Sequence, residues 1–238
     1  MTELNLAERY ARVLDRLDKA CVASGRKRGD VRLIAVSKLH PASGMVQVAQ
    51  AGQVDFGENY VQEALQKRQE LALEPAMQHV RWHMIGHVQS RKAALVAGSF
   101  ALVHTMDSQK LADAFEKRLL ALDASQPVLL EINVGNEEQK AGIDAANAPA
   151  LLGHILENCP HLAVQGLMCL PPVFDAGWAA RPYFAMLREL RDKLARQFGL
   201  ALPELSMGMS GDFEAAVAEG ATMIRVGTDI FGPRPVKN

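Results

Sequence analysis

The chain has 238 residues, of which 49% are apolar, 22% charged and 5% aromatic, so it is long enough to bury a full hydrophobic core. Its 26 basic and 27 acidic residues give a net charge of −1, which argues against a nucleic acid or an anionic membrane as partner, since both attract clustered cations. No apolar run approaches the roughly 20 residues that span a bilayer. Three cysteines without a CxxC pair favour a reduced, cytoplasmic protein.

The hydrophobic periodicity predicts a first helix over about 5–24, opened by a capping box between Asn5 and Glu8. A short apolar strand over 33–37 follows, and from there strand-like runs alternate with helical stretches. The other expected strands cover 54–57, 83–85, 101–104, 128–134, 164–168, 205–207 and 223–226. The other expected helices cover 45–51, 61–73, 91–96, 108–122, 148–158, 178–198 and 213–219.

Eight strands that alternate with helices indicate parallel strands joined by helical crossovers. At this chain length the count favours an α/β fold, a single (β/α)8 TIM barrel with an extra N-terminal helix, in one domain over 1–238. A doubly wound open sheet is the alternative.

In a barrel, the functional residues lie just after each strand, at the C-terminal mouth. Lys38 ends the first strand and would share a face with Ile34 and Val36. A lysine among apolar neighbours loses part of its preference for the charged form, and its neutral amine can attack a carbonyl. The alternative is a structural lysine that reaches solvent or pairs with Asp55 or Glu58.

The loops after the seventh and eighth strands combine glycines with hydroxyl groups. Ser210 and Thr228 supply the hydroxyls, while Gly227 lets the backbone approach a ligand closely. A helix is predicted just beyond Ser210, and its first N–H groups favour an anion. Barrels commonly hold phosphate at these two loops. The alternative is that they are two ordinary tight turns, which would need the same glycines for backbone reasons.

Arg225 alternates with Ile224 and Val226 in the last strand, so it would project into the barrel if those two residues face the helices. There it would need a partner, and a structural ion pair with an interior acid is one interpretation. His83 and His87 are four residues apart, a spacing that suits a metal on a helix but not on a strand. We therefore expect no metal site.

Several segments closely resemble the pyridoxal phosphate homeostasis protein family. They are LIAVSK over 33–38, FGENY over 56–60, WHMIGHVQS over 82–90, GLM over 166–168, LSMGMS over 205–210 and RVGTDIFG over 225–232. The segments run in order with the expected spacing. Where the family commonly has QSNK, this chain has Arg91 in place of the asparagine, and Gly211 stands where a second acid is often found.

The resemblance implies a barrel like the N-terminal domain of alanine racemase, with pyridoxal 5′-phosphate as cofactor. It implies that Lys38 forms the Schiff base with the cofactor aldehyde. Ser210, Gly227 and Thr228 match the positions that hold the phosphate. Arg225 matches the arginine that faces the pyridine nitrogen, and Asn59 matches a residue beside the ring.

The same resemblance implies a carrier without robust catalysis of its own, which binds, buffers and delivers the cofactor to apo-enzymes. An arginine, which does not readily give up a proton, makes the ring a weak electron sink. Racemisation also needs acid–base groups on both faces of the substrate carbon, and we expect no second domain here to supply one. A low-activity racemase, with His87 or water as second base, is the alternative. Two further alternative functions are a Schiff-base aldolase that acts on a phosphosugar and a scaffold protein. We expect a monomer.

Overall fold

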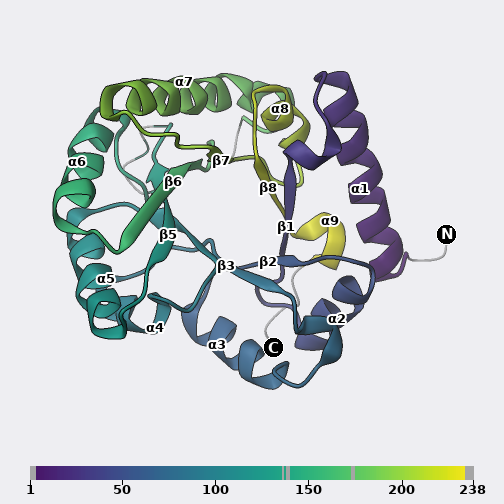
Figure 1. The fold of residues 1–238 in the computed structure, drawn as a ribbon. Helices are drawn as coiled ribbons and strands as arrows, with labels where there is room; N and C mark the ends of the chain where they lie inside the picture. The colour runs from purple at the N-terminus through teal and green to yellow at the C-terminus, as the bar shows by residue number, and fades with distance from the viewer. Residues whose placement is uncertain (1–3, 136, 138–139, 173–174, 234–238) are drawn as a thin grey trace.

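A computed structural model describes residues 4–135, 137, 140–172 and 175–233. Its centre is a closed barrel in which eight parallel strands pair in sequence order and the last pairs with the first (Figure 1). The strands are β1 (Arg32–Val36), β2 (Asp55–Glu58), β3 (Arg81–Met84), β4 (Leu102–Met106), β5 (Gln126–Ile132), β6 (Leu162–Cys169), β7 (Glu204–Ser206) and β8 (Met223–Val226).

Helices follow the strands and form the outer layer of the barrel (Figure 1). They are α1 (Leu6–Ala23), α2 (Ala42–Gln50), α3 (Val61–Glu70), α4 (Ala93–Val96), α5 (Gln109–Leu122), α6 (Ala148–Asn158), α7 (Arg181–Phe198), α8 (Phe213–Ala218) and α9 (Thr228–Phe231). The predicted (β/α)8 barrel with an extra N-terminal helix is therefore confirmed. Helix α1 starts at the expected capping box between Asn5 and Glu8.

The boundaries differ from the sequence prediction where local geometry overrides periodicity. The helix expected over 178–198 starts at Arg181, because a 3-10 turn over Gly177–Ala180 precedes it and Pro182 occupies its first turn. The last helix, α9, was not predicted, since four residues are too few to show a hydrophobic period.

The core has two layers, one between strands and helices and one inside the barrel. The large outer cluster includes Ile224 and Val226, whereas Met223 belongs to a small inner cluster. That inner cluster consists of Ile34, Leu102, Leu129, Met168 and Met223. Alternation along β8 therefore turns Arg225 inward with Met223, as the sequence predicted.

Helix α1 packs against α2, α8 and α9 and so covers the seam where β8 meets β1 (Figure 1). Within the described residues, none of the helices is both long and apolar enough to cross a membrane.

Candidate functional site

A cavity of about 270 Å³ lies at the carboxyl ends of the strands, where barrels of this kind carry their sites. It is lined by all six residues predicted from the sequence, which are Lys38, Asn59, Ser210, Arg225, Gly227 and Thr228. The other lining residues are Val36, His40, Ile85, Leu170, Met209 and Gly211. Segments that follow six different strands thus meet in one cavity.

Lys38 lies in the turn that follows β1, half-buried and one residue beyond Ser37. A buried lysine from α3 holds this turn from the outer side of the barrel. The Lys67 ammonium group donates to the Ser37 carbonyl oxygen at 2.7 Å and contacts carboxylate oxygens of Glu58 and Glu63 at 2.7 Å each. Its three N–H donors are therefore all used.

The two glutamates complete this arrangement, which we call the Lys67 cluster (Ser37, Glu58, Glu63 and Lys67). The Ser37 hydroxyl donates to Glu58 at 2.8 Å, and the backbone N–H of Leu39 donates to Glu63 at 2.6 Å. Glu58, which the sequence offered as a partner for Lys38, is thus engaged by Lys67. Burial raises the pKa of the Glu58 carboxyl, and Lys67 opposes that rise. The cluster fixes the backbone on both sides of Lys38.

Arg225 is 4% exposed and projects into the barrel below the cavity. Its guanidinium donates to the Ser206 hydroxyl at 2.6 Å and to the Cys169 carbonyl oxygen at 2.8 Å. Both partners are neutral, so these bonds do not form the ion pair that was one interpretation of the sequence. Burial lowers the pKa of Arg225 from its very high ordinary value.

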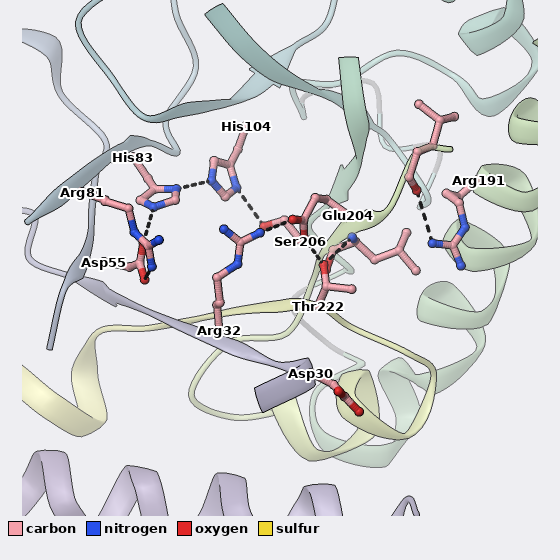
Figure 2. A network of polar contacts seen from close by, with 12 residues as sticks. Asp30, Arg32, Asp55, Arg81, His83, His104, Arg191, Glu204, Ser206 and Thr222 are labelled. Carbon is pink, nitrogen blue, oxygen red and sulfur yellow. Dashed lines mark hydrogen bonds and ion pairs between the residues drawn. The ribbon is translucent and has the colours of Figure 1, made fainter. Parts of the chain in front are cut away.

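Two histidines, connected to Arg225 through Ser206, cross the barrel interior; Figure 2 shows them with Ser206. His104 contacts the Ser206 hydroxyl at 2.9 Å and His83 at 3.0 Å, and His83 contacts Asp55 at 2.9 Å. Burial is the main reason why the pKa of each imidazole falls below its usual value. His83 is therefore a buried residue on a strand, and both of its ring nitrogens are hydrogen-bonded.

Asn59 enters the cavity from the end of β2. Its side-chain oxygen is buried and has no hydrogen-bond partner among the described residues. Gly86 packs so closely against the Asn59 backbone that a Cβ at that position would lie 2.3 Å from the Asn59 carbonyl oxygen. Glycine at 86 therefore allows the close approach that fixes Asn59, and the orphaned oxygen fits a ligand that donates a hydrogen bond.

Asp212 holds the loop after β7, and Arg16 of α1 contacts the loops after both β7 and β8. The Asp212 carboxylate accepts the backbone N–H of Met209 at 2.5 Å, which closes the turn that carries Ser210. Arg16 donates to the Ser210 carbonyl oxygen at 3.1 Å, and its guanidinium also contacts Glu214 and Asp229. The extra N-terminal helix thus positions both loops.

Two further ionisable groups are buried, Glu131 inside the barrel and Cys169 in the outer cluster between strands and helices. Glu131, on β5, is 4% exposed, and burial, together with Asp107, raises the pKa of its carboxyl to about 7. One of its oxygens has no hydrogen-bond partner among the described residues. Burial raises the pKa of the Cys169 thiol to about 12, so this cysteine stays protonated.

One group of metal-ligand side chains lies outside the cavity, between α5 and the end of α6. Asp113, His154 and Cys159 have donor atoms within 4.8 Å of one another. His154 bonds Asp113 at 2.6 Å, and burial and Asp113 raise the pKa of the Cys159 thiol to about 11. A protonated thiol is a poor ligand. The expectation that this chain binds no metal stays a prediction.

The sequence reasoning missed the residues that support the site. Of these, Ser206 lies inside the LSMGMS segment, and Lys67 follows Glu63 by four residues on a predicted helix, so both left a visible signal. Arg16 and His104 left none, because their partners are far away in the sequence. Arg91, where the chain departs from the family pattern, lies on the surface and bonds Gln89.

Comparison with known proteins agrees with this geometry. Residues 14–235 match the family described as alanine racemase, N-terminal domain. The pyridoxal phosphate homeostasis protein of Aquifex aeolicus is 43% identical over 231 residues, which cover 97% of this chain and 99% of the relative. The structure of PipY from Synechococcus elongatus, with pyridoxal phosphate bound, is 38% identical with a TM-score of 0.82 and covers 96% of this chain and 100% of that one.

An alanine racemase of Clostridium difficile shares the fold with a TM-score of 0.69 at 15% identity; the match covers 96% of this chain and 58% of the racemase. The six predicted lining residues occur in the segments that carried the resemblance, and they converge on one cavity. With a family match over most of its length and relatives above 30% identity, the chain belongs to the pyridoxal phosphate homeostasis protein family.

Proposed function

We propose that this protein binds pyridoxal 5′-phosphate in the cavity at the barrel mouth and serves intracellular homeostasis of that cofactor. The observation that carries the proposal is the convergence of an amine, a buried guanidinium and two hydroxyl-bearing glycine loops on one cavity. Relatives that bear the homeostasis name, and PipY with its bound cofactor, support it.

The residues present fit the cofactor group by group. Lys38 would bind the aldehyde, Arg225 would face the pyridine nitrogen, and Ser210, Gly227 and Thr228 would hold the phosphate. The orphaned oxygen of Asn59 is available to a donor beside the ring. Lys38 would hold the cofactor covalently: its neutral amine would bond the aldehyde carbon, and the aldehyde oxygen would be released as water with the two amine protons.

The cofactor supplies electron withdrawal from a carbon attached to its aldehyde-derived nitrogen, and the protein decides how strong that withdrawal is. Arg225 is a permanent donor, so it favours a ring nitrogen without a proton. A ring in that state withdraws electrons weakly. Binding and release of the cofactor, rather than turnover of amino acids, is the role that this arrangement supports.

Racemisation is the alternative that the sequence left open, with His87 as a second acid–base group. His87 is absent from the cavity lining and contacts Asp107 at 3.1 Å. We therefore expect no deuterium uptake at the α-carbon of amino acids in heavy water beyond that of a Lys38→Ala variant. Uptake well above that variant would establish the racemase instead.

The proposal is tested by adding pyridoxal 5′-phosphate to the purified protein, recording the visible spectrum, reducing with borohydride and mapping the labelled peptide. We expect a shifted band and a label confined to Lys38. Lys38→Ala should lose both while its unfolding midpoint stays unchanged. Lys19→Ala is the matched control, because Lys19 is an exposed lysine on α1. A label spread over surface lysines would refute the proposal, and a colourless protein that cleaves phosphosugars would favour the aldolase.

Delivery to apo-enzymes and a monomeric state belong to the same proposal. The monomeric state is tested by size-exclusion chromatography of the loaded protein alone, with detection of its mass. Delivery is tested by mixing the loaded protein with an apo-enzyme and separating the two proteins on the same column. Transfer faster than the spontaneous release of cofactor supports delivery.

A further inference from the structure

An unbroken row of hydrogen bonds runs through the barrel interior from Asp55 to Arg225, with each member on a different strand (Figure 2 shows its first four members). In order the row contains Asp55, His83, His104, Ser206 and Arg225. Its contacts measure 2.9, 3.0, 2.9 and 2.6 Å. We call these five residues the histidine row.

The chemistry of the two ends fixes the direction of every bond between them. Arg225 can only donate, and an ionised Asp55 can only accept. If His83 donates through Nε2 to Asp55, its Nδ1 must accept from Nε2 of His104. Nδ1 of His104 then accepts the Ser206 proton, and Ser206 presents a lone pair to Arg225.

The reverse direction would leave a buried group unsatisfied. Ser206 would then accept from both His104 and Arg225, and its own hydrogen would have no acceptor within the row. Such a loss is costly at a site that is fully buried. The forward direction gives each histidine nitrogen and the Ser206 hydroxyl a matching partner.

Asp55 remains ionised because its partners outweigh its burial. Burial alone would raise the pKa of Asp55, but the hydrogen bonds from His83 and Arg81 hold it below the usual value. Arg81 donates to both Asp55 oxygens, at 2.8 and 2.6 Å. The anion and its exposed arginine thus lie at the N-terminal end of β2 and β3, away from the cavity.

The histidines remain neutral for the complementary reason. Burial is the main cause of the lowered pKa values of both rings. The cations Arg32 and Arg225 act in the same direction on His104, and Arg32 and Arg81 on His83, while Asp55 opposes the fall for His83. Arg32 is itself paired with Glu204. A neutral His104 does not repel the guanidinium above it.

We propose that Asp55, His83, His104 and Ser206 are positioning residues for Arg225, which they hold by an oriented neutral acceptor, so that no carboxylate hydrogen-bonds its guanidinium directly. Asp212 and Glu131 act on Arg225 only through space. This inference rests on the proposed function, because it assigns Arg225 to the ring nitrogen. A carboxylate in direct contact would hold an arginine equally well but would neutralise it. The histidine row supplies a neutral acceptor instead, and three of its members lie between the Asp55 carboxylate and Arg225.

The order of the row is tested first in the protein without cofactor, by long-range ¹H–¹⁵N NMR of ¹⁵N-labelled histidine. We expect both His83 and His104 to carry their proton on Nε2, with a bare Nδ1, throughout about pH 6 to 8. A proton on Nδ1 of either ring, or a charged ring in this range, would overturn the oriented row. This result does not depend on cofactor binding.

The effect on the site is tested with cofactor labelled with ¹⁵N at the ring nitrogen. Ser206→Ala removes the acceptor from Arg225, so the pH midpoint at which the ring nitrogen gains a proton should rise by about one unit, a tenfold change in proton affinity. Ser206→Thr keeps the hydroxyl and should restore the wild-type midpoint. A Ser206→Ala midpoint equal to that of the wild type would overturn the positioning role while the proposed function stands. A wild type that takes up no cofactor would overturn both.

Discussion

The two residues expected to contact the cofactor, Lys38 and Arg225, are supported by buried polar groups of opposite design. The Lys67 cluster beneath Lys38 consists mainly of full charges that contact one another directly, with Lys67 between Glu58 and Glu63. The histidine row beneath Arg225 ends on charges but is neutral in between. The first support lies on the outer face of β2 under α3, and the second lies inside the barrel.

The difference follows from what each supported group must do. Lys38 needs a fixed backbone and an amine that can lose a proton. The Lys67 cluster binds the backbone of Ser37 and Leu39, and its glutamates do not line the cavity. Arg225 needs a fixed side chain that keeps its charge, which neutral acceptors provide. Buried charges that pair directly cost much when one partner is removed, so the two supports should respond differently to mutation.

The largest effect is expected for Lys67→Met. This change leaves Glu58, which is fully buried, without its cation, and breaking a buried pair costs about 3–5 kcal/mol. The loss should shrink as the pH is lowered, because burial favours the protonated form of Glu58, which no longer needs a cation. Urea unfolding at about pH 7 and at about pH 5 measures the difference.

Two variants control for this result. Lys67→Met combined with Glu58→Gln removes both charges and should recover most of the lost stability. Lys110→Met changes an exposed lysine and should leave the unfolding free energy within about 0.5 kcal/mol of wild type. A Lys67→Met protein as stable as wild type would show that the cluster is not a support.

A second effect concerns Glu131, the buried carboxyl beside the histidine row. Its folded pKa of about 7 lies above its ordinary value of 4.5, so between these values the folded chain holds a proton that the unfolded chain has released. The free energy of unfolding should therefore fall as the pH rises through this window, by at most about 3 kcal/mol. Below pH 4.5 this contribution is fully present.

Glu131→Gln mimics the protonated carboxyl and should remove this dependence. We expect its thermal midpoint to match that of wild type near pH 5 and to exceed it near pH 8. Glu70→Gln, an exposed residue on α3, is the control and should follow the wild-type curve. Parallel curves for Glu131→Gln and wild type would show that this carboxyl is ionised in the folded protein.

The two supports also differ in how far the sequence reveals them. The barrel could be predicted because strands and helices each leave a local period. Five of the six predicted lining residues follow strand ends, and Arg225 was placed inside the barrel by the alternation along the last strand. Glu63 and Lys67 are four apart on one helix, so half of the Lys67 cluster is visible locally. The histidine row joins residues from five strands, and two residues in contact, His104 and Ser206, are 102 positions apart in the sequence. No spacing encodes it, since the closure of the barrel alone brings those strands together.

The smallest effect is expected at the phosphate end, where neither support reaches directly. Thr228→Ala should weaken cofactor binding by about 1 kcal/mol, the usual value of one hydrogen bond, and somewhat more if its partner is a charged phosphate. Thr228→Ser keeps the hydroxyl and should bind like wild type. Titration of each variant with pyridoxal 5′-phosphate, and separately with pyridoxal, measures the difference. Because pyridoxal lacks the phosphate, Thr228→Ala should leave its affinity unchanged. An equal loss for both ligands would mean that Thr228 shapes the cavity as a whole and does not bind the phosphate.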